Sequence, residues 1–135
     1  LQSGIEWWNE NGAGVQAKIV CDRTSVTYAP SDLVFYTNTN VDTSANNSEG
    51  DITERLRIDS VGQVLPGADD AQNLGSSTKR WKNIYAADMH FSNEGKTNDV
   101  DGTWGDWTLQ EGEDSVFMIN NRTGKRYAIT MKEVN

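Results

Sequence analysis

Residues 52–65 read ITERLRIDSVGQVL, and this stretch decides the fold class. Apolar side chains at Ile52, Leu56 and Ile58 interleave with polar ones, which is the period of two of a half-exposed β-strand. Residues 59–62 (DSVG) end in glycine and are typical of a turn, and residues 63–65 (QVL) read as a second strand. The stretch therefore predicts a β-hairpin.

The sequence before this hairpin continues the same pattern. Residues 15–20 alternate apolar and polar side chains, and the two glycines at 12 and 14 supply a turn in front of them. Residues 32–36 place Leu33 and Phe35 on one face and further apolar side chains on the other. Such a strand needs contact on both sides, as in a sandwich or in the interior of an oligomer. Residues 37–50 bury almost nothing and are expected to form an exposed loop.

The sequence after residue 100 predicts three more strands, at 103–109, 115–119 and 127–131. The last two are expected to pair through a hairpin loop at 120–124, which ends in glycine. Residues 85–91 alternate in the same way, and residues 92–102 are polar and read as a second exposed loop. The fold class expected is mainly β, built of short antiparallel strands and hairpins.

One helical signal interrupts this pattern. Ser76, Ser77 and Thr78 are favourable helix N-cap residues, and Trp81, Ile84 and Tyr85 follow at the spacing of a helix face. The sequence therefore predicts at most one short helix, over about 77–85. Pro66 and Gly67 mark a domain boundary, which gives an N-terminal β subdomain (1–66) and a C-terminal β subdomain with the helix and the terminal hairpin (67–135).

Composition and charge exclude several classes of function. The chain of 135 residues has 20 acidic and 12 basic residues, so its formal net charge of −8 opposes binding to nucleic acid. No apolar run approaches the roughly 20 residues of a membrane span, so no membrane insertion is expected. The chain begins at Leu1 rather than Met and has no apolar leader, so we expect a fragment or a processed product.

The residues needed for most catalytic and metal sites are scarce. With one cysteine (Cys21) and one histidine (His90), neither an intrachain disulfide nor a structural zinc site is expected. Residues 98–102 (NDVDG) resemble the opening of a calcium loop, but the later ligands are missing and a solvated loop is expected. No motif of a nucleophilic enzyme or of a phosphate-binding loop occurs. The sequence predicts no enzyme, cofactor or metal.

The five tryptophans are the more informative group. A tryptophan at the surface stacks on ligands such as sugar rings, whereas a buried one fills a core or a subunit interface. Trp104 and Trp107 are three residues apart and would point to opposite faces of a strand, so they do not form one flat stacking platform there. We expect a core or interface role for them.

Three stretches carry a family resemblance. Residues 54–67 (ERLRIDSVGQVLPG) resemble a hairpin common in bacteriophage tail fibre and tailspike proteins. Residues 73–86 (NLGSSTKRWKNIYA) are similar to a signature found upstream of an endosialidase-type, self-cleaving chaperone in the distal parts of such fibres. Residues 104–134 resemble the C-terminal hairpin of phage structural proteins. Residues 92–96 (SNEGK) depart from the start of the chaperone, and the chain is too short beyond them to contain it.

The resemblance implies a virion protein, a homotrimeric tail fibre or fibre-tip segment with other tail proteins and a host-cell receptor as partners. That receptor is expected to be a surface molecule such as a glycan or lipopolysaccharide. The polar loops then become candidate receptor contacts, with the residues Asn38, Asn40, Asp42, Asn46, Asn47, Asn93, Asn98 and Asp101. The candidates for the trimer interface or core are Trp81, Ile84, Tyr85, Trp104, Trp107, Phe117 and Ile119.

Two other interpretations stay open at this point. A monomeric β-sandwich carbohydrate-binding module would bind glycans through an exposed tryptophan. A fragment of a capsule-depolymerising tailspike would need a pair of carboxylates, which the sequence does not identify among its 20 acidic residues.

Overall fold

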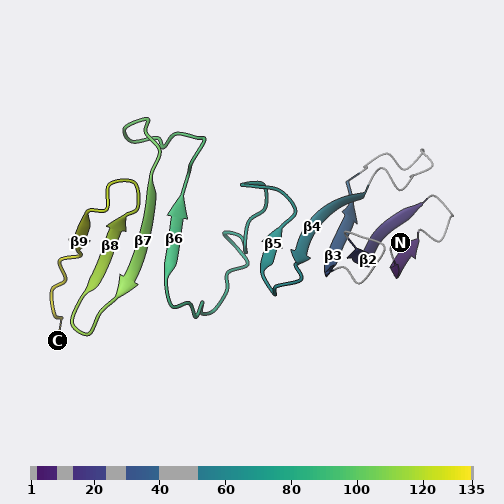
Figure 1. Cartoon of the computed structure of the whole chain (residues 1–135), viewed down its shortest axis with the longest axis horizontal. Helices are drawn as coiled ribbons and strands as arrows, with labels where there is room; N and C mark the ends of the chain where they lie inside the picture. Colours follow the sequence, from purple (N-terminus) through teal and green to yellow (C-terminus); the bar gives the residue numbers. More distant parts are fainter. Residues whose placement is uncertain (1–2, 9–13, 24–29, 40–51, 135) are drawn as a thin grey trace. The chain divides into compact units, whose positions relative to one another are not determined.

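The computed structural model describes residues 3–8, 14–23, 30–39 and 52–134. These residues form nine β-strands in two antiparallel sheets, and they contain no helix (Figure 1). The chain divides into two compact units, Leu1–Arg80 and Trp81–Asn135, and each unit contains one sheet. The prediction of a mainly β, antiparallel fold is confirmed.

The first unit contains a five-stranded sheet whose strands are neighbours in sequence order. The strands are β1 (Ser3–Trp8), β2 (Val15–Arg23), β3 (Ser31–Asn38), β4 (Ile52–Ile58) and β5 (Val64–Pro66). Every pairing is antiparallel. Because the paired strands also follow one another in sequence, the sheet is a meander.

The predicted hairpin is the pair β4–β5, with Ile58 opposite Val64. Asp59 organises its turn, because its backbone N–H donates to the carbonyl of Gln63 at 3.0 Å. The Asp59 carboxylate also accepts the backbone N–H groups of Val61 (3.0 Å) and Gln63 (2.8 Å). Gly62 adopts a φ of 89°, a conformation that costs glycine little. The turn chemistry read from residues 59–62 thus fixes the register of the hairpin.

One face of the first sheet is apolar, and we call it the apolar face. The register places Ile5, Ile19, Phe35 and Leu56 in one row across the strands. A neighbouring row contains Cys21, Leu33, Ile58 and Val64. Many of these side chains are open to solvent within the chain, and Ile5 and Val64 are 62% and 63% exposed.

The opposite face of the first sheet is organised around Arg57. Its guanidinium donates two hydrogen bonds to the Glu54 carboxylate, at 2.9 and 2.7 Å, and a third to Asp32 at 2.5 Å. Asp22 adds an ion pair at 3.6 Å. The hydrogen bonds that Arg57 donates to Glu54, followed by the one it donates to Asp32, raise the pKa of Arg57 above its usual range. Asp32 also accepts the backbone N–H of Ser60 and so connects β3 to the hairpin turn.

Apolar burial in the first sheet is small. Val15, Val20 and Val34 are the buried hydrophobic side chains among the described residues. Val20 and Val34 are cross-strand partners, and Val34 lies opposite Arg57 in the register. Val20 and Val34 therefore share a face with the charged cluster, and so does Leu65, which lies opposite Arg57, whereas Ile5, Phe35 and Leu56 lie on the other face.

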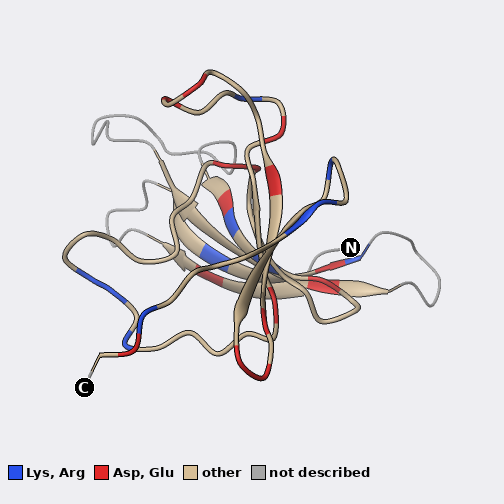
Figure 2. Ribbon diagram, turned by 90° about the vertical axis from the view of Figure 1, so that its left-hand side faces the viewer, with Lys and Arg blue, Asp and Glu red and all other residues tan. Residues whose placement is uncertain are grey.

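The second unit contains a four-stranded sheet, again in sequence order. Its strands are β6 (Met89–Ser92), β7 (Asp106–Glu111), β8 (Val116–Asn120) and β9 (Arg126–Ala128). The predicted C-terminal pair is β8–β9, and the predicted strand at 103–109 begins later, at Asp106. In the described chain, Lys, Arg, Asp and Glu residues lie on the strands as well as in the loops (Figure 2).

The two faces of the second sheet also differ. One face contains Met89, Phe91, Trp107, Leu109, Met118 and Tyr127. The rings of Trp107 and Tyr127 pack on it with centroids 5.7 Å apart. The other face contains His90, Thr108, Gln110 and Arg126, together with Phe117 and Ile119.

The predicted helix over 77–85 is wrong. Residues 76–88 form bends and irregular chain, and Trp81, Ile84 and Tyr85 are exposed, the last at 92%. The candidate cap Ser76 instead closes a tight turn, because its N–H donates to the carbonyl of Lys79 and Lys79 donates back to Ser76. Since so short a helix needs an apolar surface to pack against, its three apolar residues do not stabilise it alone.

Replacing Arg57 with methionine is expected to destabilise the first sheet by about 2 kcal/mol, because the carboxylates of Asp32 and Glu54 lose a charged hydrogen-bond donor. Urea unfolding followed by circular dichroism measures this. The control is Arg55→Met, which removes one exposed hydrogen bond to Thr37 and should cost below about 1 kcal/mol. Equal urea midpoints for the two variants would contradict the role given to Arg57.

Candidate functional site

The connection between β6 and β7 is a structured loop, residues 93–105. Asn93 closes its base: the backbone N–H donates to the carbonyl of Gly105 at 3.2 Å, and the side-chain oxygen accepts the N–H of Gly105 at 2.7 Å. These two hydrogen bonds join the two ends of the loop, at the point where β6 ends and β7 begins. We call this segment the 93–105 loop.

Asn98 and Asp101 hold the far part of the loop. The Asn98 side-chain oxygen accepts the N–H groups of Val100 and Asp101, at 2.8 and 3.1 Å. Its amide group donates to the Asp101 carboxylate (2.8 Å) and to the carbonyl of Thr103 (2.7 Å). Asp101 in turn accepts the N–H and the hydroxyl of Thr103. Val100, 96% exposed, projects from a loop whose backbone is fixed by these contacts.

The same hydrogen bonds perturb the titration of Asp101. Its pKa is lowered, first by the hydroxyl of Thr103 and then by the amide of Asn98. Donors directed at a carboxylate stabilise its charged form. Asp101 is therefore a charged part of the loop at neutral pH.

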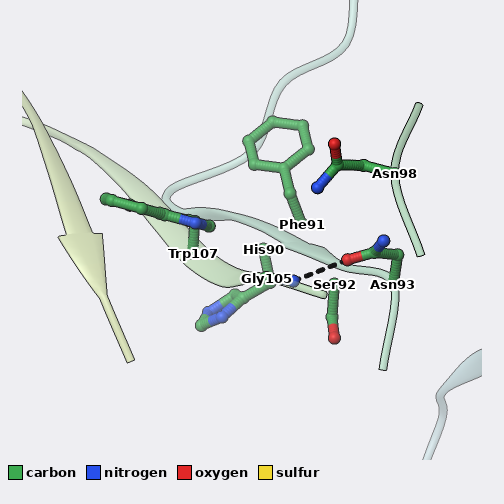
Figure 3. A pocket seen from close by; sticks show the side chains of 7 residues that line it. All are labelled: His90, Phe91, Ser92, Asn93, Asn98, Gly105 and Trp107. Carbon is green, nitrogen blue, oxygen red and sulfur yellow. Dashed lines mark hydrogen bonds between the residues drawn. The ribbon is translucent and has the colours of Figure 1, made fainter. Parts of the chain in front are cut away.

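A hollow of about 600 Å³ lies where the loop meets β6 and β7. Its lining consists of His90, Phe91, Ser92, Asn93, Asn98, Gly105 and Trp107. Figure 3 shows Phe91 between Trp107 on one side and Asn98 on the other, with the bond from Gly105 to Asn93 at the loop base. The hollow thus combines two aromatic rings with amide and hydroxyl groups.

A hydrogen-bond network supports the strand side of the hollow. The His90 ring nitrogen Nδ1 lies 3.0 Å from the hydroxyl of Thr108, which is buried. The Asn121 amide donates to the same hydroxyl at 3.0 Å and to the Asp106 carboxylate at 2.8 Å. These contacts hold β6 and β7 together and fix the His90 ring.

Trp104, at the end of the loop, packs against Arg122 from the β8–β9 turn. The Arg122 guanidinium lies 3.7 Å from the centre of the indole ring, and its Nη1 donates to the carbonyl of Trp104 at 2.7 Å. This cation–π contact fixes the loop on the sheet. Trp104 is thereby placed in a local packing contact within the second unit.

The predicted receptor-contact residues fall in three places. Asn93, Asn98 and Asp101 all lie on the 93–105 loop, and the first two line the hollow. Asn38 ends β3, and its amide donates to the carbonyl of Val15 at 2.9 Å. The other predicted contacts, Asn40, Asp42, Asn46 and Asn47, lie outside the described residues.

The predicted interface or core residues do not share one surface. Trp81, Ile84 and Tyr85 are exposed in the irregular segment before β6. Trp107 lies on the aromatic face of the second sheet, whereas Phe117 and Ile119 lie on its opposite face. Sequence reasoning did not identify the exposed residue Ile5 or a strand at residues 3–8, although the alternation in these residues (SGIEWW) carries a strand signal.

Comparisons with protein-family models, curated proteins and solved structures find no match to this chain. Across the residues that the structure describes, no group of three or more His, Cys, Asp or Glu side chains is placed to hold a metal ion. Within the same residues, no helix is long and apolar enough to cross a membrane.

The order of the 93–105 loop should depend on the charge of Asp101. Because its pKa is lowered in the folded loop, the bonds to Thr103 persist above the usual aspartate range and are lost as the pH falls through the lowered pKa. The chemical shift of the Thr103 amide proton, followed by NMR from pH 7 to pH 2, should change with a midpoint below 3.8. The variant Asp101→Asn should abolish this change. A midpoint at or above 3.8 would contradict the assignment.

Proposed function

We propose that this chain is a non-catalytic structural segment of a bacteriophage tail fibre that assembles as a homotrimer and takes part in attachment to the host-cell surface. The observation that carries this proposal is the apolar face of the first sheet. The motif resemblance of residues 54–67 and 73–86 supplies the kind of assembly.

The apolar face favours self-association. Ile5, Leu33, Leu56 and Val64 are large hydrophobic side chains on one sheet face, and each is exposed within the chain. A contiguous apolar patch of this kind marks an interaction surface in a folded protein. Burying it against copies of itself removes the exposed area without requiring a different partner.

The distribution of charge supports the same assignment. The ion pairs of Arg57 with Asp32 and Glu54 lie on the other face of the sheet. Covering the apolar face therefore leaves this cluster in its present solvent environment, and no cost of desolvating buried ions arises from it.

The 93–105 loop supports a role in attachment. It is exposed at its tip, and its backbone is fixed by the side chains of Asn93, Asn98 and Asp101. Rigid loops on a β scaffold are the usual carriers of recognition residues. In the proposed fibre, this loop would present polar groups to the host surface.

The role of the apolar face is tested by Leu56→Lys. A lysine at this position would have to lose its hydration in the interface, so the assembly should dissociate into single chains. Sedimentation velocity measures the change. The control Val61→Lys adds the same charge in the β4–β5 turn, where the side chain is 79% exposed, and should leave the assembly intact. An intact Leu56→Lys assembly would exclude this face as the interface.

The place of the protein in the virion is tested by immunogold electron microscopy. Antibodies raised against the chain are expected to label the tail fibres of phage particles whose genome encodes it. Gold particles on the capsid alone, or no gold on intact particles that contain the chain, would contradict the proposal.

A further inference from the structure

The hollow beside the 93–105 loop contains an aromatic pair that neither the sheet nor the loop fully covers. Phe91 and Trp107 are cross-strand partners on β6 and β7. Phe91 is 48% exposed, and both rings line the hollow. Aromatic faces of this kind pack against the C–H groups of a ligand ring as well as against other apolar side chains.

The rim of the hollow adds a directional polar group. The side-chain oxygen of Asn93 is occupied by the N–H of Gly105, and its amide nitrogen makes no hydrogen bond to another described residue. The Asn93 amide is therefore held in place as a donor, whereas the Ser92 hydroxyl points to the other side of β6 (Figure 3). A ligand that offers a hydroxyl oxygen would be oriented by the Asn93 amide.

The charge around the hollow restricts the ligand. None of the lining residues is Asp, Glu, Lys or Arg. The adjoining loop carries Glu94, Asp99 and Asp101 against one basic residue, Lys96. This surplus of negative charge disfavours anionic ligands, because like charges would be brought together.

From these features we infer that the hollow binds a pyranose unit of a neutral glycan. Phe91 and Trp107 contact the apolar face of the sugar ring, and the Asn93 amide donates to one of its hydroxyl oxygens. The volume of about 600 Å³ lies within the roughly 300–1,000 Å³ range of ligand pockets. This inference rests on the proposed function, since it names the chemical class of the host-surface receptor.

The alternative occupant is another protein surface, because Phe91 and Trp107 also belong to the aromatic face of the second sheet. An apolar surface placed on the hollow would take the Asn93 amide out of water without supplying an acceptor. A sugar supplies acceptors and an apolar ring face together. The combination of groups therefore favours the glycan.

The first test uses the full chain on an array of neutral hexose and N-acetylhexosamine oligosaccharides, with sialylated and uronic-acid oligosaccharides on the same array. We expect binding to at least one neutral oligosaccharide and none to the acidic ones. Absence of binding to every neutral oligosaccharide, or a preference for acidic ones, would overturn the inference.

The second test assigns the binding to the hollow. With the bound oligosaccharide as probe, Phe91→Ala should weaken the affinity at least tenfold. Met89→Ala is the matched control, because Met89 lies on the same strand and face, is 40% exposed and does not line the hollow. It should change the affinity less than twofold. Equal effects of the two substitutions would overturn the assignment.

The indole N–H resonance of Trp107, identified by its loss in Trp107→Phe, gives an independent measurement. It should shift when the oligosaccharide is added, and an unchanged resonance would contradict contact in the hollow. The mass of each variant in solution separates the two proposals. Glycan binding by a monomer would retain the site and reject the trimeric fibre, whereas a trimer without glycan binding would reject the site alone.

Discussion

Within the described residues each unit forms a single sheet, and this is the constraint that governs the structure, because both faces of a sheet need contacts that stabilise them. In the first unit, the face with Arg57 is stabilised from within the chain by ion pairs and by the buried Val20 and Val34. The face with Ile5, Phe35 and Leu56 is not covered to the same extent, and several of its side chains are exposed. Apolar burial, the main favourable contribution to folding, is therefore incomplete within one chain. Association through the apolar face would complete it.

The second unit is ordered in a different way, through hydrogen bonds from side chains to turns and loops. Its strands are short, and much of its order comes from side chains that hold turns and loops. Asn93 closes the base of the 93–105 loop, Asn98 and Asp101 fix its far part, and Arg122 packs on Trp104. A polar loop fixed in this way costs little conformational entropy on binding, because its backbone is already ordered. The aromatic pair at its base then has the Asn93 amide as a polar donor at a fixed position beside it.

The sequence predicts those parts of the fold whose pattern lies within one short stretch, such as alternating strand residues and turn residues. The β4–β5 hairpin follows from the alternation in residues 52–58 and from the turn chemistry of Asp59 and Gly62. The helix expected over 77–85 fails for the opposite reason. Its pattern is local, but Trp81 and Tyr85 are exposed, and Ser76 and Lys79 bond to each other in a tight turn instead of starting a helix.

The candidate site shows the limit of reading one sequence. Asn93 and Asn98 could be named as loop residues from composition. That Asn93 bonds to Gly105, or that Phe91 lies opposite Trp107, depends on strand register between distant segments. The apolar face is likewise a property of five paired strands, and β1 was not among those predicted. Pairings of this kind are set by the whole sheet.

The proposed trimer would complete the apolar burial that a single chain leaves incomplete. The absolute mass of the unmodified chain in solution, measured by light scattering on a sizing column, tests this assembly. We expect three times the 15.0 kDa chain mass, about 45 kDa, at every concentration that can be measured. A stable species of 15.0 kDa would contradict it.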